Sequence, residues 1–90
     1  MKPQVLIVMG SVSDLPVMEE AGKLLKEFGI PYKMTVASAH RTPERIMQLV
    51  SYAEENGVDV IIAGAGMAAH LAGSFASHTI IPVIGVPIDS

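Results

Sequence analysis

The chain has 90 residues, half of them hydrophobic, and a formal net charge of −3, which suits one small domain spanning residues 1–90. The acidic balance and the lack of basic runs give no electrostatic basis for binding nucleic acid. The lack of cysteine excludes disulfides and thiolate sites. The first apolar stretch, residues 5–9, is too short for a signal peptide or a membrane span, so we expect a cytoplasmic protein without membrane contact.

The N-terminal third predicts a strand, a turn and a helix. Residues 5–9 form a continuous apolar run, as in parallel strands that are covered on both faces. In the turn that follows, Ser13 or Asp14 is suited to cap a helix. Apolar residues at helical spacing then continue to Phe28, and Gly29 is expected to end this helix.

The rest of the chain continues the alternation of strands and helices. We expect an edge strand at 32–37, a helix at 43–56, a strand at 58–63, a tight glycine turn at 64–66, a helix at 67–77 and a strand at 82–86 that is ended by Pro87. Right-handed crossovers then give a parallel sheet. This is an α/β fold, and the strand order 2-1-3-4 would make it flavodoxin-like. All four strands would end on one rim.

The loop after the second strand carries the strongest chemical signal. Ser38, His40 and Arg41 place a hydroxyl, an imidazole and a guanidinium at the carboxyl end of a strand, where open α/β sheets bind ligands. An imidazole exchanges protons near neutral pH, and a guanidinium can hold a phosphate with two hydrogen bonds. Thr42 and Pro43 are suited to begin the next helix. The alternative is a solvated turn with Arg41 in water.

The turn after the first strand is a candidate anion site. The hydroxyls of Ser11 and Ser13 lie next to the backbone N–H groups of a predicted helix start, which favour a phosphate. Asp14 would repel a phosphate but would accept hydrogen bonds from sugar hydroxyls. The alternative is ordinary helix capping, which needs only one of these side chains.

The glycine turn supports a rival interpretation. Residues 64–69 fit the looser dinucleotide pattern G-x-G-x-x-A, and Asp89 lies about 20 residues further on. The match falls in the third βα unit rather than the first, which weakens it. His70, expected in the first turn of the next helix, is either a site residue or packed among apolar neighbours. His78 is interpreted as structural, and the histidines lack the usual spacing of metal ligands.

Four stretches together resemble one family. They are Met-Gly-Ser-x-Ser-Asp at 9–14, Ser-Ala-His-Arg-Thr-Pro at 38–43, Gly-Ala-Gly-x-Ala-Ala-His-Leu at 64–71 and Pro-Val-Ile-Gly-Val-Pro at 82–87. In this order they are similar to class I N5-carboxyaminoimidazole ribonucleotide mutase, the catalytic subunit of phosphoribosylaminoimidazole carboxylase, from de novo purine (IMP) biosynthesis. The resemblance implies a flavodoxin-like three-layer sandwich and a homo-octamer. It also implies that no metal or cofactor takes part in moving a carboxylate to carbon 4 of an imidazole ribonucleotide.

The resemblance also implies a role for individual residues. His40 would be the general acid–base, Asp14 would bind the ribose, and Ser38 would support the loop. The phosphate would be bound by Ser11, Ser13 and Arg41. The pocket for the base and for trapped carbon dioxide would be lined by Gly66, Ala68, Ala69, His70 and Leu71, with His70 as a second catalytic candidate.

The chain departs from the family pattern in three ways. Met67 stands where the family usually has glycine, and Ala72 stands where it usually has proline. Family members also continue with another strand and more helices after the position of Ser90. We therefore expect a bare edge on the last strand and one sheet face short of a helix. A catalytically inert fragment, or a chain that depends on partner subunits for cover, remains an alternative.

Overall fold

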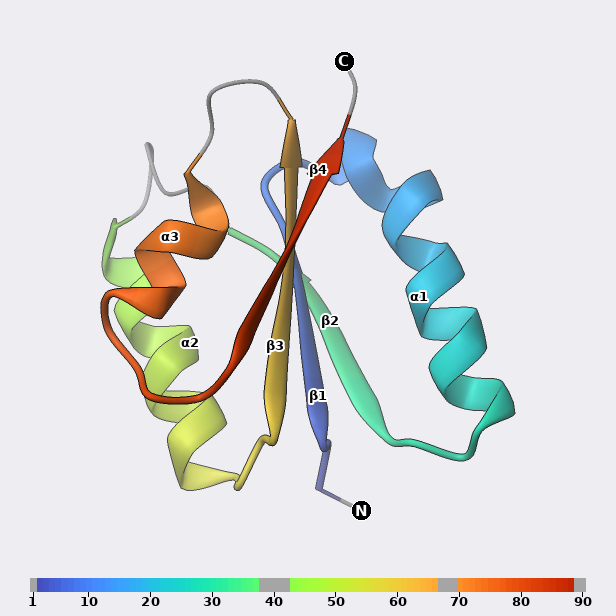
Figure 1. Ribbon diagram of the computed structural model, residues 1–90, viewed down its shortest axis with the longest axis horizontal. Helices are drawn as coiled ribbons and strands as arrows, with labels where there is room; N and C mark the ends of the chain where they lie inside the picture. Colours follow the sequence, from blue (N-terminus) through green and yellow to red (C-terminus); the bar gives the residue numbers. More distant parts are fainter. Residues whose placement is uncertain (1, 38–42, 67–69, 89–90) are drawn as a thin grey trace.

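Four parallel strands form a sheet in the order β2-β1-β3-β4 (Figure 1), the flavodoxin-like order considered above. The computed structural model describes residues 2–37, 43–66 and 70–88. The strands are β1 (Val5–Met9), β2 (Tyr32–Val36), β3 (Val60–Gly66) and β4 (Val83–Ile88). The helices are the short 3₁₀ helix η1 (Val12–Asp14), α1 (Leu15–Glu27), α2 (Pro43–Glu55) and α3 (Leu71–Ala76).

Helices lie on both faces of the sheet. α1 covers one face, and α2 and α3 cover the other (Figure 1). β1 lies between β2 and β3, and all five of its residues are buried, which explains its continuous apolar sequence. Gly29 and Gly57 have φ angles of +71° and +67°. Both follow the helix ends, and a left-handed conformation there favours glycine, as predicted.

Two apolar clusters form the core, one on each face of the sheet. The larger cluster joins the sheet to α2 and α3. In it, Leu71 and Phe75 are 1% and 0% exposed and lie one turn apart on α3. A helix of six residues is too short to be stable alone, so α3 depends on the packing of these two side chains.

β3 continues further than predicted. The expected tight turn at 64–66 is wrong, because these residues belong to β3 and pair with β4 as far as Gly66 and Ile88. Gly64 leaves room there for Met18, since a Cβ at this position would lie 2.8 Å from Cε of that buried side chain, which would have to shift. α3 begins at Leu71, and His70 is its non-helical N-cap. The expectation that His70 lies in the first turn of a helix starting at residue 67 is therefore wrong, because β3 extends to Gly66.

Pro87 does not end the last strand. It lies within β4, opposite Ala65. The N–H of Ile61 donates to the carbonyl of Pro82 at 2.9 Å, so the even-numbered residues of β4 direct their backbone groups toward β3. Because directions alternate along a strand, Pro87 directs its missing N–H toward the open edge, where proline is tolerated.

Both outer strands behave as edges, as expected. β2 and β4 each pair with one neighbour in the described sheet. On β4, Ile84 is 53% exposed, because α1 packs on β1 and β2 and no described helix covers β4 on that side. None of the described helices is long and apolar enough to cross a membrane.

Candidate functional site

The carboxyl ends of β1 and β3 meet at one rim of the sheet. The N–H of Gly10 donates to the carbonyl of Gly64 at 3.0 Å. A Cβ on Gly10 would lie only 3.2 Å from Cβ of Ala65. The turn after β1 therefore lies directly against the last residues of β3, and two of the sequence motifs meet there.

The turn after β1 is organised by its serines. Ser11 has extended φ and ψ angles of −153° and 150° and is the N-cap of η1. Its Oγ accepts a hydrogen bond from the N–H of Ser13 at 3.2 Å, and the two Oγ atoms are 2.9 Å apart. Both residues are exposed. The hydroxyls therefore stand together at the start of a helix.

The side chain of Asp14 does not make the capping hydrogen bond that the sequence predicted. It occupies the N-cap position of α1, yet its side chain makes no capping hydrogen bond. The expectation that Ser13 or Asp14 caps the helix by its side chain is therefore wrong, because Ser11 caps the inserted turn η1. Oδ2 of Asp14 lies 3.9 Å from the position of a Cβ on Gly10, so the carboxylate is turned back toward the β1 turn.

The turn has the properties of an anion site. The N–H groups of Ser13, Asp14 and Leu15 already donate within this turn, to Ser11 and Val12, and Pro16 has no N–H. The exposed hydroxyls of Ser11 and Ser13 are therefore the groups that could donate to a phosphate, which the helix dipole also favours. The adjacent carboxylate of Asp14 would favour hydroxyl donors. A sugar phosphate is therefore a suitable ligand.

The end of β3 and the start of α3 supply the other described candidates. Gly66 is the last residue of β3 and is partly exposed. His70 is exposed at the N-cap of α3, with no capping hydrogen bond from its side chain. Leu71 instead lies in the core beneath. The end of β3 and the start of α3 lie at the same end of the sheet as the turn formed by residues 10–14, which we call the serine turn (Figure 1).

Several predicted site residues lie outside the described residues. They are Ser38, His40, Arg41, Ala68 and Ala69, together with Met67 and Asp89. Both flanks of the 38–42 loop are described. The buried Ala37 donates its N–H to the carbonyl of Met9 at 2.8 Å, and α2 begins at Pro43 as predicted. Ala37, which follows β2, therefore lies directly beside the end of β1.

One positioning contact was missed in the sequence. Nη2 of Arg45 donates to Oγ1 of Thr35 at 2.8 Å in a partly buried setting. This hydrogen bond joins the first turn of α2 to β2, the two described elements on either side of residues 38–42. The residues are ten positions apart, and neither belongs to a local motif, so the sequence offered no signal for the contact.

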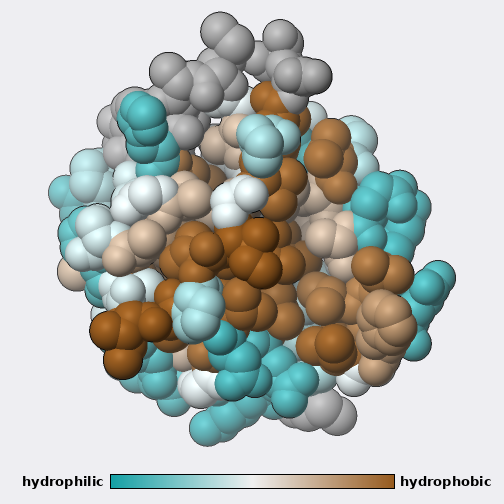
Figure 2. Space-filling view, in the orientation of Figure 1, coloured by the Kyte–Doolittle hydropathy of each residue, from teal (hydrophilic) through white to brown (hydrophobic). Residues whose placement is uncertain are grey.

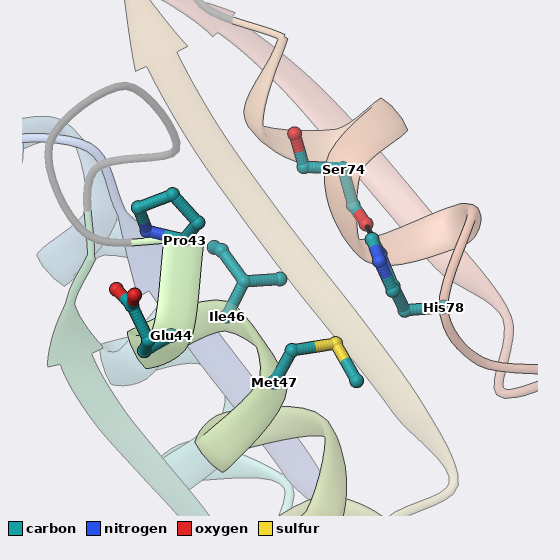
Figure 3. Close-up of a pocket in the computed structure, with 6 residues that line it drawn as sticks. All are labelled: Pro43, Glu44, Ile46, Met47, Ser74 and His78. Carbon is teal, nitrogen blue, oxygen red and sulfur yellow. Dashed lines mark hydrogen bonds between the residues drawn. The ribbon is translucent and has the colours of Figure 1, made fainter.

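An open cavity of ≈ 250 Å³ lies between α2 and α3 (Figure 3). It is lined by Pro43, Glu44, Ile46, Met47, Ser74 and His78. Nδ1 of His78 lies 2.8 Å from the carbonyl oxygen of Ser74 and 2.9 Å from Oγ of Ser77. These local contacts agree with the structural role predicted for His78. The described groups of His, Asp and Glu include none of three or more that could hold a metal ion.

The dinucleotide pattern is not supported by the backbone. Its first two glycines, Gly64 and Gly66, lie inside β3 rather than in a turn after it. In a dinucleotide site, glycines of this pattern let the turn approach a pyrophosphate. Here the side chain of Met18 occupies the space next to Gly64.

Sequence comparisons give a consistent set of relatives. Residues 4–90 match the model of a family described as AIR carboxylase. The N5-carboxyaminoimidazole ribonucleotide mutase of Pyrococcus horikoshii is 64% identical over 89 residues, which are 99% of this chain and 50% of that protein. The mutase of Thermotoga maritima is 60% identical over 88 residues, which are 98% of this chain and 52% of that protein. The phosphoribosylaminoimidazole carboxylase of Saccharomyces cerevisiae is 55% identical over 87 residues, which are 97% of this chain and 15% of that protein.

Solved structures agree with this result. The crystal structure of Treponema denticola PurE matches with a TM-score of 0.90 at 32% identity, over 98% of this chain and 56% of that one. The family resemblance and the flavodoxin-like fold are thereby confirmed. The chain spans about half the length of the Pyrococcus horikoshii and Thermotoga maritima mutases that it matches.

Proposed function

The chain belongs to the AIR carboxylase family, and on this premise we propose that it acts as an N5-carboxyaminoimidazole ribonucleotide mutase in purine biosynthesis. The observation that carries the proposal is the contact between Gly10 and Gly64. It brings the serine turn and the end of β3, two of the motifs that carry the resemblance, to one rim.

The substrate's phosphate would bind at the serine turn. The hydroxyls of Ser11 and Ser13 are exposed and adjacent, and they lie at the N-terminal end of η1 and α1, where the helix dipole favours negative charge. Arg41 would add a charge-assisted hydrogen bond. The carboxylate of Asp14 would accept hydrogen bonds from the ribose, with Ser38 supporting the loop.

The reaction would move one carboxylate within one molecule. The bond from the exocyclic nitrogen to the carboxylate carbon breaks, carbon dioxide is released, and the nitrogen takes a proton from the imidazole of His40. Carbon 4 of the ring then forms a bond to the carbon dioxide and returns its proton to the same imidazole. The protons balance, and the product is an isomer of the substrate.

Carbon dioxide must stay in the pocket between the two steps. Gly66, Ala68 and Ala69 would provide close, apolar walls that exclude water and so limit hydrolysis of the carbamate. His70, exposed at the start of α3, would face the ring from the opposite side of the pocket, and Leu71 would support it from the core. We further propose a cytoplasmic homo-oligomer, an octamer by family resemblance.

Turnover of N5-carboxyaminoimidazole ribonucleotide tests the function. We expect the chain to form 4-carboxyaminoimidazole ribonucleotide and His40→Asn to lower kcat by about 10²- to 10⁴-fold, the usual contribution of general acid–base catalysis. His78→Asn is the matched control, because this histidine lies near the α2–α3 cavity, and its turnover should not change. Equal turnover by His40→Asn and the unmodified chain would remove His40 as the acid–base.

A nucleotide-binding module without catalysis remains the rival function. It requires the glycines of residues 64–69 to approach a phosphate, whereas Gly64 is packed against Met18. Calorimetry with a nicotinamide dinucleotide distinguishes the two functions, and we expect no heat of binding at millimolar ligand.

A further inference from the structure

The serine turn approaches β3 more closely than pairing in the sheet requires. The parallel register that pairs Met9 with Gly64 places Gly10 beside Ala65, one residue further along. Side chains of such neighbours are separated by the strand spacing of about 4.8 Å. A Cβ on Gly10 would instead lie 3.2 Å from Cβ of Ala65. The chain therefore leans toward β3 at Gly10, and any larger residue at this position would force the two segments apart.

Packing on both faces of the sheet holds β3 in place at this contact. On the face covered by α2 and α3, Ala65 packs against the larger core cluster. On the other face, the buried Met18 and the side chain of Ile88 lie against Gly64. Figure 2 shows hydrophobic side chains over the centre of the molecule that continue toward α1 on the right. Residues 11–13 of the serine turn are exposed, so an added side chain at position 10 would displace the turn rather than β3.

The serine turn carries the groups that would bind a sugar phosphate. The hydroxyls of Ser11 and Ser13 are exposed, and Oδ2 of Asp14 lies 3.9 Å from the position of a Cβ on Gly10. From the same contact, β3 continues to its last residue, Gly66, with a rise of about 3.3 Å per residue. The close approach at Gly10 therefore sets how far the oxygen atoms of the serine turn lie from the end of β3.

We propose that Gly10 and Ala65 are positioning residues for the proposed mutase site, and that their contact fixes the distance between its phosphate end and its ring end. The inference rests on the proposed function only in assigning the phosphate to the serine turn and the ring to the pocket at Gly66. A ribonucleotide reaches from one end to the other, so its affinity depends on this distance. Ribose 5-phosphate reaches only the serine turn, so its affinity depends on the distance much less.

Calorimetry of the full chain with two ligands, aminoimidazole ribonucleotide and ribose 5-phosphate, tests the proposal without requiring turnover. Gly10→Ala should weaken binding of the ribonucleotide about tenfold or more, which corresponds to the loss of one hydrogen bond to a charged group. The same substitution should weaken binding of ribose 5-phosphate much less. Gly73→Ala is the matched control, because a Cβ on Gly73 would have nothing within 4 Å, and it should leave both affinities unchanged.

A compensating substitution separates displacement of the serine turn from other effects of the added methyl group. Ala65→Gly removes the atom that lies nearest to a Cβ at position 10. Gly10→Ala combined with Ala65→Gly should therefore bind the ribonucleotide nearly as tightly as Ala65→Gly alone. Ala65→Val is a second variant that enlarges the other partner of the contact, and it too should weaken the ribonucleotide more than ribose 5-phosphate. Circular dichroism checks that each variant is folded.

Each other outcome decides the proposal. Equal weakening of the two ligands by Gly10→Ala would overturn it, because the contact would then shape the serine turn itself rather than its distance from β3. Affinity that Ala65→Gly does not restore would overturn it in favour of a methyl group that occupies the ligand's space. Failure of both Gly10→Ala and Ala65→Val to fold, or of either ligand to bind the unmodified chain, would likewise overturn it. If the affinities follow the expected pattern but N5-carboxyaminoimidazole ribonucleotide is not turned over, the positioning role is supported and the proposed mutase activity is contradicted.

Discussion

Among single residues, Gly64 shows most clearly how packing constrains the site. A Cβ at this position would lie 2.8 Å from Cε of Met18 and 3.2 Å from Cδ1 of Ile88. Gly64 also accepts the hydrogen bond that places the serine turn. The same residue therefore allows close packing beneath the rim and holds the turn above it.

Gly64→Ala should destabilise the fold by about 1–3 kcal/mol, the usual cost of adding a methyl group to a packed core. Gly73→Ala is the control. Gly73 lies in α3 with nothing within 4 Å of a Cβ, so alanine should stabilise the helix by about 0.5–1 kcal/mol. Urea unfolding measures both changes, and a Gly64→Ala protein as stable as the unmodified chain would contradict the packing role.

Single residues also show where sequence patterns stop being informative. The serine turn was located correctly from Ser11, Ser13 and Asp14, because hydroxyls and a carboxylate between a strand and a helix are a local signal. Which of them caps was not predictable, since that depends on the 3₁₀ turn inserted before α1. The contact between Thr35 and Arg45 was missed because it depends on the register of a strand against a helix.

Among helices and strands, α3 depends most on tertiary packing. Its six residues include Phe75, which is fully buried between the helix and the sheet. Phe75→Ala should cost about 3–5 kcal/mol in unfolding free energy. Phe28→Ala is a matched control with the same change of side chain, and it should cost less than about 0.5 kcal/mol because Phe28 is on the surface. Similar losses for the two variants would contradict the assigned core.

The pairing of β4 with β3 predicts which amide hydrogens of β4 exchange slowly with solvent. The N–H groups of Ile84 and Val86 face β3, whereas those of Val83 and Gly85 face the open edge. We expect slow exchange at 84 and 86 and fast exchange at 83 and 85 in the chain alone, measured by NMR. Uniform protection along β4 would show that its outer edge is already paired.

The ends of β3 and β4 show why element boundaries were harder to predict than the elements themselves. Glycines at 64 and 66 and proline at 87 are turn signals in a local reading. In the sheet, Gly64 makes room for Met18 and Pro87 directs its missing donor to an edge. Both facts depend on neighbours that are distant in sequence.

In the protein as a whole, local patterns predicted the alternation of strands and helices and the parallel sheet, but they did not establish the order of the strands. Alternating apolar strands and amphipathic helices, joined by right-handed crossovers, leave few possible arrangements, and the observed order β2-β1-β3-β4 is one of them. The contact between the serine turn and β3 follows from that order, because both lie at the carboxyl ends of neighbouring strands. The bare side of β4 was expected from the family's greater length rather than from any local signal.

Binding of the substrate's phosphate at the serine turn is the step on which the proposed function depends. NMR titration with aminoimidazole ribonucleotide, beside the same nucleoside without its phosphate, measures this step without requiring turnover. We expect the ribonucleotide to shift the amide signals of residues 11–14, the nucleoside to leave them unchanged, and Ser11→Ala to weaken binding about tenfold or more through loss of a hydrogen bond to a charged group. Identical shifts with and without the phosphate, or no shifts at residues 11–14, would contradict the assignment of this turn as the phosphate site.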